Sequence, residues 1–267
     1  MLRITRIEDD PIYSLPHRTS GPKGKVRRNR LPCYRAYATG LPESVDALVF
    51  TSDLQGREAG GQNRLLGVPV AEALGNLIQQ QAIPAPAALC LCGDLYDYPD
   101  CHKLGGTGPV DEVYDAFSKI APEVVGVMGN HDQLTFPNKL PSNVHVLDGD
   151  LQTIGCLTVG GVSGIVGNPR RNQRRTEGDF LAEVEKVTSQ QPDLLLLHQG
   201  PSDEERGRRG DPDLALSLAT GYNGLTVFGH TRWHWPWLVT LGSGQVMNVD
   251  GRVVVILDER RHGPMPA

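Results

Sequence analysis

The chain has 267 residues, of which 39% are hydrophobic, and it carries a formal net charge of −5. This length can bury a substantial core, and the acidic balance argues against binding of nucleic acid or anionic membranes through the charge of the whole protein. The 31 glycines and 20 prolines indicate many turns and loops rather than a helical bundle.

The first residues, MLRITRIEDDPIY, carry acidic side chains where a signal peptide has its apolar core, and no apolar run approaches the length that crosses a bilayer. We therefore expect a cytoplasmic protein with no membrane partner. Five scattered cysteines argue against a disulfide framework, and the lack of C-x-x-C pairs argues against structural zinc. The oligomeric state stays open.

Residues 1–40 are basic, rich in proline and without a clear period, and we expect them to form an irregular N-terminal arm. Residues 41–267 are expected to form a single domain. Short apolar runs in this part predict buried strands at residues 47–50, 88–92, 124–129, 194–197 and 225–228.

Helical periodicity between these strands predicts helices over residues 65–81, 110–120 and 180–189. Strands that alternate with helices indicate an α/β fold. Residues 238–257 differ, because they predict hairpin strands with a tight turn at Asp250-Gly251. A mixed sheet or two packed sheets would accommodate both parts.

Each of the five predicted strands is followed by polar residues. In chain order these are Ser52-Asp53-Leu54-Gln55, Gly93-Asp94-Leu95-Tyr96-Asp97, Gly129-Asn130-His131-Asp132, His198-Gln199-Gly200 and Gly229-His230. Loops at the carboxyl ends of strands form the ligand crevice of open α/β sheets, so these groups can converge. Carboxylate, amide oxygen and imidazole together suit Mn²⁺, Fe or Zn²⁺. Taken singly, an Asp after a strand is often a helix cap and a single His is often structural.

In this order the residues resemble the pattern of the calcineurin-like metallophosphoesterases, which is D-x-H, G-D-x-x-D, G-N-H-[DE], H and G-H-x-H. The resemblance spans residues 48–257, and the G-N-H-D element at residues 129–132 is its most specific part. It implies a metallophosphoesterase-like α/β/β/α sandwich of two mixed sheets flanked by helices. It also implies hydrolysis of phosphodiesters or phosphomonoesters by a metal-activated hydroxide, with one or two divalent ions, Mn²⁺ first and Fe or Zn²⁺ as alternatives.

The resemblance also assigns the metal ligands. Asp94 would bridge two metals, Asn130, His198 and His230 would complete the site of one metal, and Asp53 would bind the other. Phosphate esters repel nucleophiles, so a site that hydrolyses them must supply positive charge, as metal ions do.

Three further residues receive roles beside the metals. His131 would stabilise the transition state or protonate the leaving oxygen, since a histidine next to the site can act as a general acid. Asp132 would orient His131. Asp97 would not bind a metal itself but would support the residues that do.

Two residues depart from the family pattern, and both belong to the same metal. Gln55 stands where D-x-H has its histidine, and Arg232 stands where G-H-x-H has its second histidine. A glutamine oxygen can coordinate weakly, but a guanidinium has no free lone pair.

Three interpretations of these departures remain open. The second metal is absent or weakly held, and Arg232 pairs with Asp53 or binds a phosphate oxygen. Alternatively, His234 replaces the missing ligand. In the third interpretation catalysis is lost, and the protein is a regulatory module that binds a phosphorylated ligand.

Two basic runs, at residues 23–30 and 170–175, predict solvated loops or contacts to a phosphorylated substrate. The expected partner is a phosphorylated small molecule or a nucleotide. Nucleic acid is a further, less favoured partner, and it would involve these basic runs in a phosphodiesterase or a scaffold. Trp233, Trp235 and Trp237 either pack in the core or stack on a base.

Overall fold

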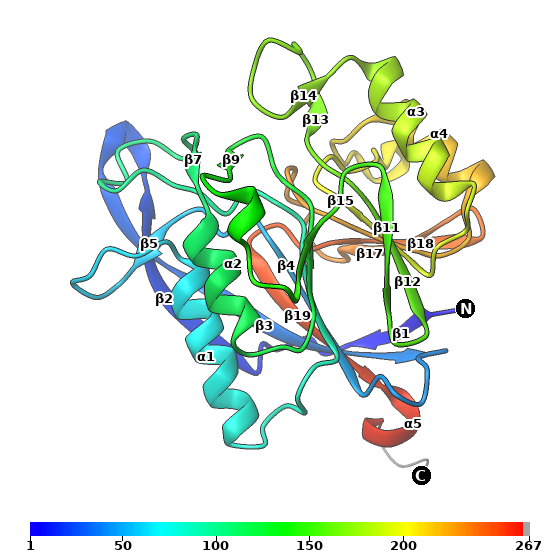
Figure 1. Ribbon diagram of the computed structural model, residues 1–267, viewed down its shortest axis with the longest axis horizontal. Helices are drawn as coiled ribbons and strands as arrows, with labels where there is room; N and C mark the ends of the chain where they lie inside the picture. The colour runs from blue at the N-terminus through cyan, green and yellow to red at the C-terminus, as the bar shows by residue number, and fades with distance from the viewer. Residues whose placement is uncertain (264–267) are drawn as a thin grey trace.

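The structure, a computed structural model, describes residues 1–263. Two β-sheets lie face to face at its centre, with helices α1 and α2 on one side and α3 and α4 on the other (Figure 1). The predicted α/β fold, an α/β/β/α sandwich of two mixed sheets flanked by helices, is confirmed. Among the helices of residues 1–263, none combines the length and the apolar character needed to span a membrane.

The larger sheet has nine strands. In order of pairing they are β10 (Val144–Val146), β8 (Val124–Gly126), β6 (Ala88–Leu91), β4 (Ala47–Ser52), β19 (Arg252–Asp258), β3 (Val26–Thr39), β2 (Tyr13–Ser20) and β5 (Arg57–Glu58), while β1 (Arg3–Ile7) also pairs with β3. The four strands from β10 to β4 are parallel, and β19 runs antiparallel to β4 and parallel to β3.

Alternate side chains of this sheet enter two different cores, as the period of two in a strand requires. In β4, Leu48 and Phe50 join the core between the sheets, whereas Val49 joins the core beneath helices α1 (Gly67–Gln79) and α2 (Asp111–Ser118). The near-continuous apolar runs in the sequence therefore reflect burial on both faces of the sheet.

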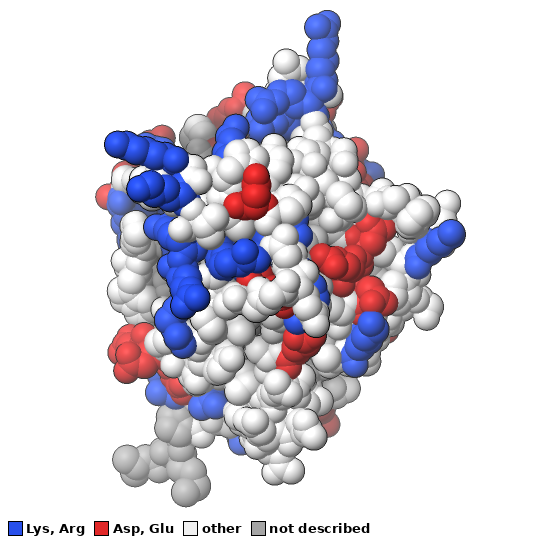
Figure 2. All heavy atoms as spheres, turned by 90° about the vertical axis from the view of Figure 1, so that its left-hand side faces the viewer, with Lys and Arg blue, Asp and Glu red and all other residues white. Residues whose placement is uncertain are grey.

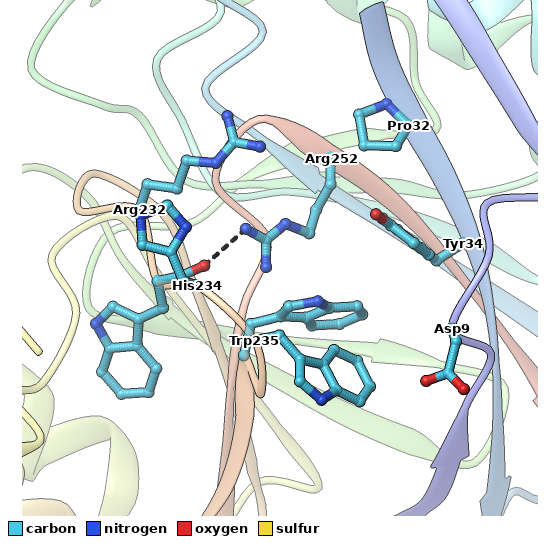
Figure 3. Close-up of a pocket in the computed structure, with 9 residues that line it drawn as sticks. Asp9, Pro32, Tyr34, Arg232, His234, Trp235 and Arg252 are labelled. Carbon is cyan, nitrogen blue, oxygen red and sulfur yellow. Dashed lines mark hydrogen bonds between the residues drawn. The ribbon is translucent and has the colours of Figure 1, made fainter. Parts of the chain in front are cut away.

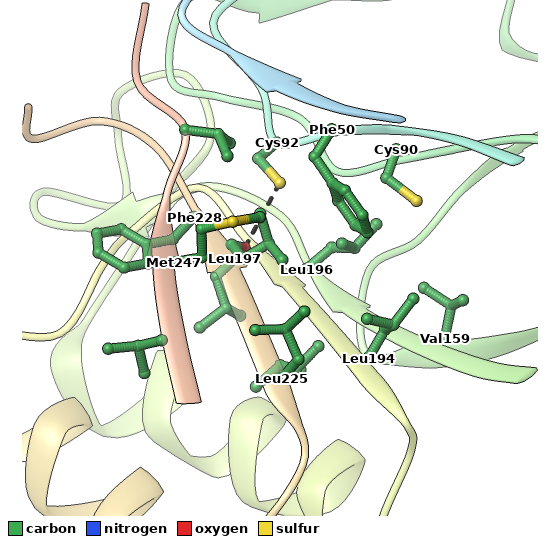
Figure 4. Packing of buried hydrophobic residues seen from close by; sticks show 14 of the residues in the cluster. Phe50, Cys90, Cys92, Val159, Leu194, Leu196, Leu197, Leu225, Phe228 and Met247 are labelled. Carbon is green, nitrogen blue, oxygen red and sulfur yellow. Dashed lines mark hydrogen bonds between the residues drawn. The ribbon is translucent and has the colours of Figure 1, made fainter. Parts of the chain in front are cut away.

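The smaller sheet has six strands. In order of pairing they are β11 (Asp150–Ile154), β12 (Leu157–Val162), β15 (Leu194–Leu197), β16 (Leu225–Phe228), β18 (Gly244–Asn248) and β17 (Leu238–Leu241). Figure 4 shows the contact between the sheets, where Phe50 and Cys92 of the larger sheet meet Phe228 and Met247 of the smaller one. The Cys92 thiol lies 3.5 Å from the Val227 carbonyl oxygen, to which it donates a hydrogen bond.

Helices α3 (Glu177–Thr188) and α4 (Pro212–Gly221) flank the smaller sheet, and both begin at a side-chain cap. Thr176 accepts a hydrogen bond from the backbone N–H of Asp179, and Asp211 accepts one from that of Leu214. The sequence prediction does not include α4, although Asp211 followed by proline is a typical helix start.

The remaining elements are short. They are the two-stranded ladders β7 (Gly108–Pro109) with β9 (Asp132–Gln133) and β13 (Ile165–Val166) with β14 (Arg174–Arg175), helix α5 (Glu259–His262), and 3-10 helices at Pro22–Gly24, Pro137–Lys139 and Glu204–Arg206.

The expectation of an irregular arm over residues 1–40 is wrong, because this segment contributes β1, β2 and β3 to the larger sheet. Residues 27–30 are exposed and polar, so β3 shows no clear period in the sequence, while its second half is held between β19 and β1. Figure 2 faces the side of the molecule on which the β2–β3 hairpin lies, and lysine and arginine side chains gather along one edge of this view.

The predicted tight hairpin turn at Asp250-Gly251 is also wrong. The hairpin is formed by β17 and β18, which are joined at Gly242-Ser243. Residues 250–251 instead lead the chain from β18 in the smaller sheet to β19 in the larger sheet. Sequence alone could not separate these cases, because both need a turn between two apolar strands.

Candidate metal centre

Three of the predicted site residues stand at sharp turns directly after buried strands. Asp53, Asp94 and His230 adopt left-handed backbone conformations, with φ of 53°, 55° and 63°. Non-glycine residues seldom adopt this conformation, and it is enriched at functional sites. The turns direct the three side chains into the space between the ends of the two sheets.

The loops after β6 and β8 approach each other closely at Gly93 and Gly129. A Cβ atom at Gly93, whose φ is +83°, would lie 2.4 Å from the backbone nitrogen of Gly129 and 2.9 Å from His198 Nδ1. Only glycine fits at this contact. The close approach brings Asp94, which follows Gly93, next to Asn130, which follows Gly129.

The ligand atoms of Asp94, His198 and His230 all lie within 4.8 Å of one another. Asn130 Oδ1 and His198 Nε2 are buried and form no hydrogen bond within residues 1–263. Buried polar atoms normally have a partner, so two such atoms beside a carboxylate and a second imidazole fit a bound cation. This donor set matches the four residues predicted for one metal.

His198 is held in one orientation by the backbone of the larger sheet. Its Nδ1 lies 2.7 Å from the Cys92 carbonyl oxygen, so Nδ1 carries the proton of that hydrogen bond. Nε2 then remains directed toward the site, 3.3 Å from Asp94 Oδ2. Such a bond to the far ring nitrogen is the usual way in which a metal-binding histidine is oriented.

The two histidines have opposite pKa shifts. Burial lowers the pKa of His198, but the charge of Asp94 and its contact with the ring more than offset this and raise the pKa to about 10. Burial and the nearby positive charge of His198 lower the pKa of His230 to about 4. In the absence of a cation, the proton of the site therefore resides on His198, paired with Asp94.

His131 and Asp94 are joined through the backbone. The His131 N–H donates to Asp94 Oδ1 at 3.0 Å, and His131 Nδ1 lies 2.7 Å from the Gly106 carbonyl oxygen. His131 Nε2 is 3.7 Å from Asp94 Oδ2. The imidazole thus lies at the edge of the ligand cluster, with one nitrogen fixed and the other facing the site.

Asp132 does not orient His131 directly, contrary to the prediction. Its carboxylate accepts hydrogen bonds from the backbone N–H groups of Asp94, Leu95, Tyr96 and Gly129, at distances of 2.7 to 3.2 Å. It is fully buried, and its position is explained by the many N–H groups of the two tight loops that need an acceptor. Asp132 therefore fixes the loop that carries Asp94.

Asp97 lies behind this loop. One carboxylate oxygen accepts the N–H of Tyr98 at 2.8 Å, and the other is buried without a hydrogen-bond partner in residues 1–263. Burial raises the pKa of Asp97. Its carbonyl oxygen accepts a hydrogen bond from Arg57.

The position of the second metal is filled by internal hydrogen bonds. The amide nitrogen of Gln55 donates to Asp94 Oδ2 at 3.0 Å. Asp53 Oδ2 accepts from the Ser52 hydroxyl at 2.7 Å and from the backbone N–H of His230 at 2.9 Å. Asp53 is thus engaged in joining the ends of β4 and β16 and does not belong to the cluster of Asp94, His198 and His230.

Arg232 is exposed, and within residues 1–263 it forms neither an ion pair nor a side-chain hydrogen bond. Its guanidinium lies beside the turn at Gly251, where a Cβ atom would be 3.3 Å from Arg232 Nη1. The expected pairing of Arg232 with Asp53 is therefore not formed, because Asp53 is already satisfied by Ser52 and His230. His234 is exposed on the same loop and does not join the cluster.

Three more residues lie near the site, and the sequence patterns identify only one of them, Arg174, through the basic run at residues 170–175. Asn172 donates to the carbonyl oxygens of Asn130 and Asp132 at 3.2 and 2.9 Å, and so ties residues 170–175 to the metal centre. Arg174 is close enough for its charge to act on Asp94 and His230. Burial raises the pKa of Asp250, which adjoins Asp53. The basic run is a signal for Arg174, but no local pattern marks Asn172 or Asp250.

Two pockets flank residues 230–236. One has a volume of about 770 Å³ and is lined by residues 206–209 and 230–236, so it opens beside His230. The other, of about 380 Å³, is shown in Figure 3 and is lined by Asp9, Tyr34, Trp235 and Arg252 among others. The exposed basic residues 23–30 line neither pocket.

Comparison with known protein families gives a match that covers most of the chain. Residues 47–232 match the family model of the calcineurin-like phosphoesterases. A comparison with curated proteins gives no match.

Comparison with solved structures shows the same fold in TT1561 of Thermus thermophilus. That protein is 16% identical with a TM-score of 0.53, and the match covers 76% of this chain and 88% of that chain. The phosphopantetheinyl hydrolase of Mycobacterium tuberculosis is a weaker match. It is 15% identical with a TM-score of 0.46, and the match covers 84% of this chain and 95% of that chain.

Proposed function

Since the chain belongs to the calcineurin-like phosphoesterase family, we propose that it hydrolyses phosphate esters with one divalent cation, held by Asp94, Asn130, His198 and His230. The observation that carries this proposal is the cluster of Asp94, His198 and His230, whose ligand atoms lie within 4.8 Å of one another, together with the buried Asn130 Oδ1, which has no hydrogen-bond partner within residues 1–263. Mn²⁺ is the proposed ion, with Fe and Zn²⁺ as alternatives, because the donors combine carboxylate, amide and imidazole.

When bound, the cation would offset the negative charge of the phosphate and lower the pKa of the attacking water. The chain itself supplies the remaining groups. His131 presents Nε2 at the edge of the cluster, where it can donate a proton to the leaving oxygen. Arg174, whose charge reaches the cluster, is proposed to contact the phosphate.

The proposal of a single cation depends on three features of the second position. The Gln55 amide donates a hydrogen bond to Asp94, the carboxylate on which a second ion would also depend. Asp53 is engaged with Ser52 and His230, and Arg232 offers no lone pair. A second ion would have to displace these hydrogen bonds without gaining an imidazole ligand.

The test is the metal content of protein purified without chelator, together with turnover of bis-p-nitrophenyl phosphate after addition of Mn²⁺. We expect about one ion per chain, and we expect Asn130→Ala to lower Mn²⁺ affinity by roughly 10- to 100-fold, since it removes one ligand. Asn76→Ala, at an exposed position of α1, is the matched control and should retain the metal.

The other outcomes decide between the remaining interpretations. A content near two ions would contradict the single site and favour Gln55 or His234 as a ligand. A content near zero would refute the metal centre. One bound ion without turnover would favour the alternative function, a catalytically inactive protein that binds a phosphorylated ligand.

A further inference from the structure

We propose that the larger of the two pockets binds a second phosphate group and the planar ring of the substrate, so that the substrate class is a nucleoside diphosphate. This inference depends on the proposed function only in that the hydrolysed phosphate lies at the metal centre. The pocket is lined by residues 206–209 and 230–236, and we call it the arginine pocket.

The arginine pocket adjoins the metal centre, because His230 belongs to both. Its volume of about 770 Å³ lies within the range of about 300–1,000 Å³ that is typical of small-molecule sites. A ligand with one phosphate at the metal centre can therefore extend into this pocket.

The lining of the arginine pocket includes four arginines and no carboxylate. Two of these arginines have carboxylate partners, because Arg206 and Arg208 each lie 3.2 Å from Asp203 and Arg206 also lies 3.9 Å from Glu205. Arg209 and Arg232 are exposed and have no ion pair within residues 1–263. The charge of Arg232 acts on Asp250, but neither guanidinium has a carboxylate at ion-pair distance within residues 1–263, so both can bind a phosphate through paired hydrogen bonds.

Trp233 holds the two walls of the arginine pocket together. Its ring is buried, its Nε1–H donates to the Arg209 carbonyl oxygen at 3.0 Å, and the Arg208 guanidinium lies 4.9 Å from the ring centroid. Its own carbonyl oxygen accepts a hydrogen bond from Arg252 at 2.9 Å, which is drawn in Figure 3. The backbone that carries Arg209 and Arg232 is therefore well supported.

Trp235 offers an exposed aromatic surface on which the planar ring of the substrate can stack. It remains 57% exposed, although it lies between the two pockets and contacts Trp237 edge to face, with 5.9 Å between the ring centroids. An exposed tryptophan at the rim of a basic pocket can stack on a base without reading its identity.

The test uses metal-free protein in the presence of EDTA, so it does not depend on hydrolysis. The three tryptophans of the chain are Trp233, Trp235 and Trp237, so tryptophan fluorescence reports directly on this region. We expect AMP to bind about tenfold or more tightly than adenosine, because its phosphate gains charged hydrogen bonds in the arginine pocket. Arg209→Ala and Arg232→Ala should each weaken ADP binding about tenfold.

Arg206→Ala is the matched control, because it removes the same charge from the same pocket at a residue that already has carboxylate partners, Asp203 and Glu205. Its effect on ADP binding should stay below about threefold. Trp235→Leu, followed by calorimetry, should weaken ADP but leave inorganic pyrophosphate unchanged.

Equal binding of AMP and adenosine would overturn the proposal, and so would an Arg206→Ala effect as large as that of Arg209→Ala. If ADP binds as expected but bis-p-nitrophenyl phosphate is not hydrolysed after Mn²⁺ is added, the pocket stands and the proposed hydrolysis of phosphate esters fails. If phosphate esters are hydrolysed but ADP does not bind, only the pocket fails.

Discussion

At the scale of single residues, His198 determines how the metal centre responds to pH. Its Nδ1 is tied to the Cys92 carbonyl oxygen, and its Nε2 faces Asp94. Burial opposes the charged ring, but Asp94 raises the pKa of His198 to about 10. A cation needs the free lone pair of Nε2, so the cation and the proton compete for the same atom.

We therefore predict that Mn²⁺ affinity rises with pH by roughly tenfold per unit between about pH 6.5 and 8.5, because one proton must leave His198 throughout this range below its pKa. His230, with its pKa lowered to about 4, is already neutral and adds no further proton. Calorimetric titrations in buffers of different ionisation enthalpy would count the protons released. An affinity that does not change with pH would contradict this role of His198.

At the scale of elements, the helices on the larger sheet pack through a glycine. Gly67 is the first residue of α1, and a Cβ atom there would lie only 2.3 Å from Val113 Cγ1 of α2. Gly75, in the middle of the same helix, has its nearest neighbour, Ile120 Cγ2, at 3.4 Å. The same substitution should therefore have opposite effects at the two positions.

We predict that Gly67→Ala lowers the free energy of unfolding by about 1–3 kcal/mol through overpacking against Val113. Gly75→Ala should raise it by roughly 0.5–1 kcal/mol, since alanine favours a helix interior. Urea unfolding of both variants measures these two changes in the free energy of unfolding. Equal changes at the two positions would show that the contact with Val113 does not constrain α1.

The elements also show how far a sequence can predict such a fold. The strands predicted at residues 194–197 and 225–228 have the same bounds in the structure, because short apolar runs between polar residues mark strands buried on both faces. The sequence does not predict β3 or the separation of β18 from β19, since strand partners are set by packing between distant parts of the chain.

For the candidate site too, some features could be predicted from the sequence and others could not. The convergence of Asp94, Asn130, His198 and His230 is expected, because each follows a predicted strand, and the structure brings the ligand atoms of three of them within 4.8 Å of one another. The hydrogen-bond partners of Asp132 and the unpaired state of Arg232 within residues 1–263 could not be predicted. They depend on exact side-chain positions, which no sequence pattern specifies.

At the scale of the whole molecule, the metal centre joins the two sheets. Asp94 and Asn130 follow strands of the larger sheet, whereas His198 and His230 follow strands of the smaller one. A cation that binds all four residues would connect the halves of the sandwich. Its binding free energy would then add to the stability of the folded state.

We predict that removal of metal lowers the free energy of unfolding, and that Mn²⁺ at about 100 times its dissociation constant restores about 2.7 kcal/mol. The measurement is urea unfolding with EDTA and with Mn²⁺. Asn130→Ala should show a much smaller gain at the same Mn²⁺ concentration. An identical gain in this variant would mean that the ion stabilises the protein from another site.

The position of β19 has a consequence for how the protein is made. This strand pairs with β4 on one side and with β3 on the other, so it is the inner strand that unites the two parts of the larger sheet. Residues 1–251 are translated before it, and during that time β3 and β4 each present an open edge, the feature by which nascent chains associate wrongly. The two parts of the larger sheet therefore cannot unite until residues 252–258 have been synthesised and can pair with both strands.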